Sequence, residues 1–211
     1  METIIYILRH GQSVTNESGV FSGSNEVDLS PLGEKQAEKA SEYLIDKGID
    51  FIYSSPLSRA VNTGLPLAKK LGKQIEIEKD FREICFGSWE GKTKNYLEEN
   101  EENFLLWREH PVKVGAKDGE KPIDAGMRFA FALEKIATKH LGKTVLITAH
   151  GGVLVACMCY LGFLNSEKAT CNDICKNAGI SKLIYKDGKF SLEFYAFDEY
   201  LADYRVGLKL V

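Results

Sequence analysis

The residues of this chain that are best suited to chemistry are two histidines, His10 and His150, each of which is followed by a glycine. Arg9 stands beside the first histidine, and Arg59 lies near the start of an expected helix. A neutral imidazole is a competent nucleophile near pH 7, because its unperturbed pKa is about 6.5. The planar guanidinium of arginine matches phosphate oxygens in two-point contacts. Together these residue types predict phosphoryl transfer with His10 as the nucleophile.

One carboxylate is expected at the same site. Glu83 follows Arg82 in a glycine-bearing loop, and it could protonate the oxygen of a leaving alcohol and then activate water. A divalent metal would need further carboxylates beside the histidines, and Glu83 is the one carboxylate that the sequence predicts there. Arginines can neutralise a phosphoryl group themselves, since this transfer needs little besides positioning and charge stabilisation. We therefore expect no metal ion.

Other chemically versatile side chains are expected to be structural. We expect His110 and His140 to lie at the surface or to serve as satisfied structural partners, and Trp89 and Trp107 to serve packing. Gly151 is expected to form a strand-to-helix turn that also offers a free backbone N–H to an anion.

Short apolar runs must position the two histidines. The runs that resemble buried strands of a parallel sheet cover residues 3–8, 51–54 and 144–148. His10 follows the first of these runs and His150 follows the third. Ligands of open parallel sheets bind beyond the carboxyl ends of the strands. We therefore expect both histidines, together with Arg59, at one edge of a sheet.

Helices are expected between these strands. Ser30-Pro31 and Ser55-Pro56 each pair a capping serine with a proline suited to the first helical position. The expected helices cover residues 30–48, 55–72, 127–139 and a segment from His150 to Leu161, with a short strand at 75–77. Asp187-Gly188 predicts a hairpin between strands at 182–185 and 190–195. This order predicts an α/β fold with a mostly parallel sheet, covered on both faces, and an antiparallel edge.

The length of 211 residues suits a single domain, residues 1–211. Residues 92–126 have mixed charge and little periodicity, and we expect a lid-like insertion there. The net charge of −3 predicts no general attraction to nucleic acid or to anionic membranes. We expect the partner to be a small phosphate ester, and a homodimer is compatible with the sequence.

The chain also carries information about its compartment. No apolar run approaches the ~20 residues of a membrane span, and the N-terminus lacks the basic and small-residue features of a signal peptide. The five cysteines are an odd number and are spread out, which suits reduced thiols better than disulfides and offers no zinc pattern. We therefore expect a cytoplasmic protein.

Several segments together resemble the histidine phosphatase superfamily, in its phosphoglycerate mutase-like branch. They occur in the order that this family shows: Leu8–Ser13 with Asn16, Ser54–Ala60 with Thr63, Arg82–Gly91, Ala149–Val153 and Asn177–Ser181. The resemblance implies a three-layer α/β/α sandwich and a covalent phosphohistidine on His10. It further implies phosphate contacts from Arg9, Arg59, His150, Asn16, Ser22 and Gly23, a proton donor in Glu83, and no metal or organic cofactor.

The resemblance also ranks the activities. The segment from Glu83 to Gly91 is similar to that of phosphatase members, including α-ribazole phosphatase-like and broad-specificity enzymes. This favours a phosphomonoesterase, in which water takes the phosphoryl group from His10. The alternatives are a 2,3-bisphosphoglycerate-dependent phosphoglycerate mutase and a non-catalytic member that binds a phosphorylated ligand.

Overall fold

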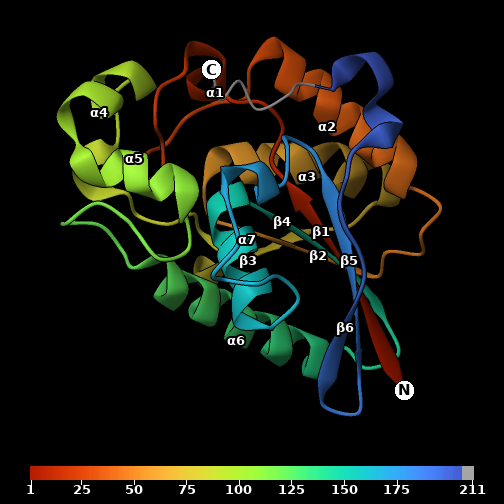
Figure 1. Cartoon of the computed structure of the whole chain (residues 1–211). Helices are drawn as coiled ribbons and strands as arrows, with labels where there is room; N and C mark the ends of the chain where they lie inside the picture. Colours follow the sequence, from red (N-terminus) through yellow and green to blue (C-terminus); the bar gives the residue numbers. More distant parts are fainter. Residues whose placement is uncertain (206–211) are drawn as a thin grey trace.

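The computed structural model describes residues 1–205, and within them one sheet forms the centre of the molecule (Figure 1). Its strands lie in the order β3-β2-β4-β1-β5-β6. They are β1 (Glu2–Arg9), β2 (Phe51–Ser54), β3 (Ile75–Ile77), β4 (Thr144–Ala149), β5 (Ile180–Lys186) and β6 (Lys189–Phe197). Strands β1 to β4 pair in parallel, whereas β5 runs antiparallel to β1 and β6 runs antiparallel to β5. The expected mostly parallel sheet with an antiparallel edge is confirmed.

Helices cover both faces of the sheet. One face carries α2 (Pro31–Leu44) and α3 (Ser58–Leu71), and the other carries α6 (Pro122–Lys139) and α7 (Gly151–Tyr160). Alternation along β1 fills both interfaces, because successive side chains of a strand point to opposite faces. Ile5 and Ile7 join the apolar core under α6 and α7, while Tyr6 and Leu8 join the core under α2 and α3. The three-layer α/β/α arrangement is therefore confirmed.

Two helices begin at residues other than those expected. Helix α3 begins at Ser58, three residues after the expected capping serine, with Leu57 as its N-cap. The hydroxyl of Ser55 instead lies 2.7 Å from His150 Nε2 and accepts from Leu57 N at 3.3 Å. Helix α6 begins at Pro122 rather than at Met127. Pro122 occupies a position in its first turn, and no side chain of the described residues caps this end of the helix. The sequence offers no polar cap there to mark the start.

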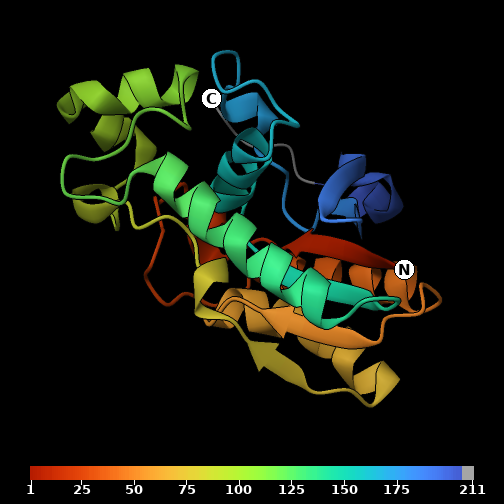
Figure 2. The ribbon, with the colours of Figure 1, turned by 90° about the horizontal axis from the view of Figure 1, so that it is seen from below.

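Residues 92–126 contain two short helices, α4 (Lys94–Asn100) and α5 (Glu102–Glu109). With α1 (Val14–Ser18), they lie beyond the end of the sheet at which β1 finishes (Figures 1 and 2). The ring of Phe21 contacts Phe104 at 5.3 Å and Trp107 at 5.0 Å between ring centroids. These aromatic contacts attach the α4–α5 segment to the loop that follows α1.

The remaining expectations about the helices concern their character. Within residues 1–205, every helix is too short or too polar to cross a membrane. On α6, Phe129, Leu133 and Ile136 are spaced at the helical period and are all buried, so they share the face that packs into the core.

Close packing of α6 against α7 depends on Gly126. A Cβ atom at this position would lie 2.5 Å from both the carbonyl carbon and the carbonyl oxygen of Ala156. We expect Gly126→Ala to lower the free energy of unfolding by about 1–3 kcal/mol, because an overpacked backbone contact relaxes poorly. Urea unfolding measures this. The control is Gly115→Ala, since a Cβ there would make only ordinary contacts of 3.5 Å or more. Equal stability of both variants would contradict the packing argument.

Candidate active site

Two neighbouring parallel strands bring the two histidines together. Arg9 at the end of β1 pairs with Ala149 at the end of β4, so His10 and His150 leave the sheet side by side. Their ring centroids lie 5.1 Å apart with an interplanar angle of 57°. His10 N donates to Ala149 O at 2.9 Å, which fixes the two strand ends to each other. The expected meeting of distant segments at one edge of the sheet is thus observed for this pair.

Both imidazoles are buried among positive charges rather than in apolar packing. His10 is 4% exposed and His150 is 0% exposed. Burial, followed by the charges of Arg59 and Arg9, lowers the pKa of His10 well below its ordinary value of 6.5. Burial and then Arg59 lower the pKa of His150 in the same way. Both rings are therefore neutral at pH 7.

The hydrogen bond of His10 defines which nitrogen is reactive. Nδ1 lies 2.7 Å from the carbonyl oxygen of Gly11. A carbonyl oxygen only accepts, so Nδ1 carries the proton and donates it to this oxygen. The lone pair then resides on Nε2, which is the nucleophilic nitrogen of this tautomer.

Three buried polar atoms around the histidines have no hydrogen-bond partner within residues 1–205. They are Arg9 Nε, Ser22 Oγ and His150 Nδ1. Buried polar groups in folded proteins are almost always paired, so each exception calls for an explanation. All three come from segments that the sequence placed at a phosphate. An anion with several acceptor oxygens suits two nitrogens and a hydroxyl arranged in this way.

Glu83 lies at the start of α7, next to the histidine pair. Its carboxylate accepts backbone hydrogen bonds from Gly152 N at 3.0 Å, Val153 N at 2.7 Å and Ile84 N at 2.9 Å. The amino end of a helix favours a negative charge. This arrangement holds one carboxylate beside His150, as the role of an acid or base for the leaving group requires.

Arg59 is anchored by backbone oxygens beside the site. Its guanidinium donates to Gly23 O at 2.6 Å and to Asn25 O at 2.9 Å. The side chain is 1% exposed, so its charge acts on the histidines through little solvent. The carbonyl oxygen of Gly23 therefore holds Arg59 in place, and the expected phosphate contact of this residue stays a prediction.

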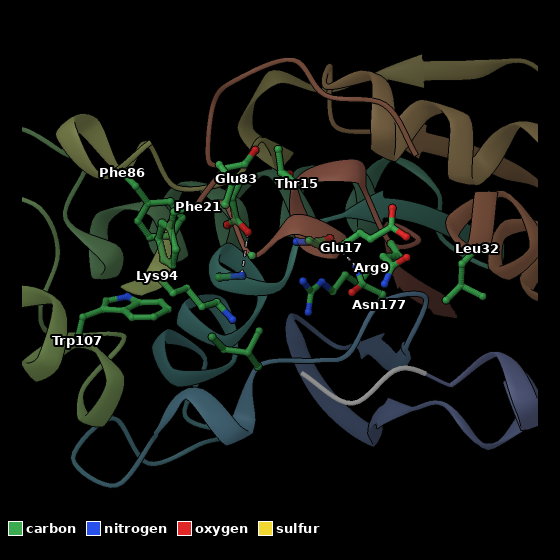
Figure 3. A pocket seen from close by; sticks show the side chains of 17 residues that line it. Arg9, Thr15, Glu17, Phe21, Leu32, Glu83, Phe86, Lys94, Trp107 and Asn177 are labelled. Carbon is green, nitrogen blue, oxygen red and sulfur yellow. Dashed lines mark hydrogen bonds between the residues drawn. The ribbon is translucent and has the colours of Figure 1, made fainter. Parts of the chain in front are cut away.

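A cavity of about 390 Å³ opens beside these residues (Figure 3). Figure 3 shows Arg9 and Asn177 on one side of it, and Lys94 and Trp107 on the other. Of the expected site residues, its lining includes Arg9, Asn16, Ser22 and Glu83. His10, Arg59 and His150 are not among the residues that line it. The further lining residues are Gln12, Thr15, Glu17, Gly19, Val20, Phe21, Leu32, Phe86, Lys94, Trp107, Gly152, Ile174 and Asn177.

The remaining expected residues have assignable places. Gly151 begins α7, and a Cβ there would lie 3.0 Å from Arg9 Cζ, so a side chain would crowd the guanidinium. Arg82 lies apart from the site, with its guanidinium 3.5 Å from both Asp80 and Glu120. His140 is structural, because its Nε2 lies 2.9 Å from the hydroxyl of Tyr53.

Sequence reasoning missed three contributors to the site. Ser55 contacts His150 rather than capping a helix. Lys94 lines the cavity from the first turn of α4, where the charged surroundings in the sequence gave no signal. Asn177 lines the cavity and donates to the His10 loop. Its place in a segment that resembles a family motif was the one available signal.

The described part of the chain contains no candidate metal site of the usual ligand types. No group of three or more His, Cys, Asp or Glu side chains within residues 1–205 is arranged to hold a metal ion. The cysteines are free thiols, and burial raises the pKa of Cys175 to about 12.

A comparison with protein families identifies the chain. The model of the histidine phosphatase superfamily, branch 1, matches residues 5–198. The chain belongs to this superfamily. A putative phosphoserine phosphatase 2 of Hydrogenobacter thermophilus is 37% identical over 192 residues, which cover 90% of this chain and 93% of that protein. A 2,3-bisphosphoglycerate-dependent phosphoglycerate mutase of Bifidobacterium longum is 31% identical over 196 residues, with 78% and 79% covered.

Solved structures give the same assignment. This histidine phosphatase superposes on a mycobacterial glucosyl-3-phosphoglycerate phosphatase in complex with VO3 with a TM-score of 0.83 and 25% identity, which covers 92% of this chain and 99% of that one. The predicted phosphomonoesterase activity is confirmed, and the chain is a phosphoric monoester hydrolase.

The lowered pKa values of the two histidines predict that acid destabilises this histidine phosphatase. Below about pH 6.5 the unfolded chain binds protons on its histidines, whereas the folded protein keeps His10 and His150 neutral until the pH reaches their lower pKa values. The unfolded state then binds more protons, so the free energy of unfolding decreases as the pH falls below 6.5. Urea unfolding between about pH 7 and pH 5 measures this decrease.

The matched control is the double variant His10→Gln/His150→Gln. In this variant the free energy of unfolding should decrease less steeply over the same pH window. Some decrease should remain, because His140, whose pKa is also lowered by burial, is present in both proteins. An unchanged slope in the double variant would contradict the assignment of this pH dependence to the histidine pair.

Proposed function

We propose that this histidine phosphatase hydrolyses a small phosphate monoester through a covalent phosphohistidine on His10. The observation that carries the proposal is the neutral histidine pair, together with the three buried polar atoms of Arg9, Ser22 and His150 that have no hydrogen-bond partner in the described part of the chain. Arg9 and Arg59 supply positive charge and N–H donors for the phosphoryl oxygens, and the neutral ring of His150 supplies a further N–H donor. Charge stabilisation of this kind is the main requirement of phosphoryl transfer.

The proposed reaction has two steps. The cycle begins with Glu83 as a carboxylic acid. In the first step, Nε2 of His10 forms a bond to phosphorus as the bond to the ester oxygen breaks, and Glu83 gives its proton to the leaving alcohol and becomes a carboxylate. In the second, water attacks phosphorus, Glu83 takes a proton from that water, and the bond to Nε2 breaks. Inorganic phosphate leaves, and both side chains return to their starting states. Glu83 suits this role because backbone N–H groups hold its carboxylate beside His150.

The proposed substrate is a small ester whose alcohol part is charged, such as phosphoserine. The relative from Hydrogenobacter thermophilus is named as a phosphoserine phosphatase, and a cavity of about 390 Å³ suits a small ligand. Among the described residues, the lining contains one cation besides Arg9, namely Lys94, and one anion besides Glu83, namely Glu17. These two groups suit a carboxylate and an ammonium group.

Residues 92–126 fit the role of a lid over this site. Lys94 from α4 and Trp107 from α5 line the cavity opposite Arg9 (Figure 3). We propose that the segment shapes substrate selection within one domain. The free, mostly buried thiols also support a reducing, cytoplasmic setting.

The direct test is phosphate release from p-nitrophenyl phosphate and phosphoserine by the wild-type protein and by His10→Ala. We expect hydrolysis that EDTA leaves unchanged and that His10→Ala abolishes. His110→Ala is the matched control, because His110 lies outside the site at the end of α5, and it should keep wild-type activity. Activity that survives in His10→Ala would overturn the proposal. Interconversion of 2- and 3-phosphoglycerate that outpaces hydrolysis would instead favour the mutase reaction.

The role of Lys94 is tested with Lys94→Met. We expect kcat/KM for phosphoserine to fall by about 10- to 100-fold, which corresponds to the loss of a charged hydrogen bond of about 1.5–3 kcal/mol. Activity toward p-nitrophenyl phosphate should change little, because its leaving group has no carboxylate. The control is Lys92→Met, since Lys92 pairs with Glu101 outside the cavity. Equal losses for both substrates would contradict a role in recognising the leaving group.

A further inference from the structure

The side chain of Asn177 makes contacts that the proposed mechanism has not yet used. Its Nδ2 lies 3.2 Å from His10 O, 3.3 Å from Gly11 O and 3.0 Å from Asn16 Oδ1. The two carbonyl oxygens can only accept, so the amide nitrogen faces them as a donor. The residue is 8% exposed, so water competes little for these contacts. One amide group thereby connects the segment that precedes β5 to the loop that carries His10.

One of these acceptors is the oxygen that defines the tautomer of His10. The carbonyl oxygen of Gly11 receives both His10 Nδ1 at 2.7 Å and Asn177 Nδ2 at 3.3 Å. If this carbonyl turned away, Nδ1 would lose its acceptor and the ring could rotate or exchange its proton between nitrogens. The amide of Asn177 opposes that rotation because it holds the same oxygen.

The backbone around Asn177 strengthens the connection. Ala178 N donates to His10 O at 3.1 Å, and Arg9 N donates to Gly179 O at 3.0 Å. Ala178 has φ +56°, in the left-handed region that disfavours residues with a Cβ. Such strain persists where the surrounding structure determines the backbone, and it concentrates at functional sites. The segment is therefore held in one conformation against the His10 loop.

We propose that Asn177 is a positioning residue for the nucleophile. Its amide fixes the carbonyl groups of His10 and Gly11, so that Nδ1 keeps its proton and Nε2 remains aimed at phosphorus. Asn177 forms no bond with the reacting atoms in this account. The inference rests on the proposed role of His10 as the nucleophile.

The test compares Asn177→Ala with the isosteric Asn177→Asp. The second variant keeps the shape of the side chain but replaces the donor with an acceptor that faces three acceptors. We expect both to lower kcat by about 10- to 100-fold, as misplacement of a reacting group does. KM and inhibition by inorganic phosphate should stay near their wild-type values. A residue that merely fills space would tolerate Asn177→Asp.

Two further measurements separate positioning from general damage. Asn172→Ala is the matched control, because Asn172 is an exposed asparagine in the same segment, and it should retain wild-type kcat. In protein with ¹⁵N-labelled histidine, the Nδ1–H proton signal of His10, assigned by its absence in His10→Gln, should broaden or disappear in both Asn177 variants. Thermal unfolding establishes that each variant is folded, and Asn177→Asp decides the matter if Asn177→Ala does not fold.

The outcomes are distinct. Wild-type kcat in Asn177→Asp, a loss confined to KM, or an unchanged His10 Nδ1–H signal would overturn this inference alone. Activity retained in His10→Ala would overturn the proposed function itself.

Discussion

The structure depends on one electrostatic constraint, which is the burial of two uncharged imidazoles among fixed positive charges. His10 and His150 lie 5.1 Å apart between ring centroids, and the charges of Arg59 and Arg9 act on both rings. A protonated imidazole in that setting would face both desolvation and like-charge repulsion. The same positive field that keeps the rings neutral attracts a phosphoryl group, so nucleophile and anion site come from one arrangement.

The fold supplies this arrangement by pairing strands and fixing loop carbonyls. The parallel pairing of β1 with β4 sets the two histidines side by side, and backbone oxygens then hold the charged groups around them. Arg59 is held by Gly23 O and Asn25 O, and His10 is held by Gly11 O. Main-chain acceptors orient these groups without neutralising them, because a carbonyl carries no net charge. The positive charge therefore remains available for a phosphate ester.

The sequence predicted the parts of this site that short patterns encode. Apolar runs that end in His-Gly placed both histidines at strand ends, and strand adjacency then brought them together. The role of Ser55 was hidden, because Ser-Pro is also a helix-start pattern, and only the tertiary contact with His150 shows that its hydroxyl is used elsewhere. Lys94 was similarly hidden in a charged segment whose fold depends on aromatic contacts between distant residues. Roles that depend on a pattern within one segment could be predicted from the sequence, whereas roles that depend on contacts between distant segments could not.

The most direct measurement of the central claim is a crystal structure of the protein with vanadate, an ion that mimics the phosphoryl group in transfer. The account predicts vanadium bonded to Nε2 of His10, with its oxygens within about 2.7–3.2 Å of Arg9 Nε, Ser22 Oγ and His150 Nδ1. These atoms are three of the five buried side-chain nitrogens and oxygens that lack hydrogen-bond partners within residues 1–205. Vanadate bound at Lys94 or elsewhere, with His10 Nε2 out of bonding distance, would contradict the account.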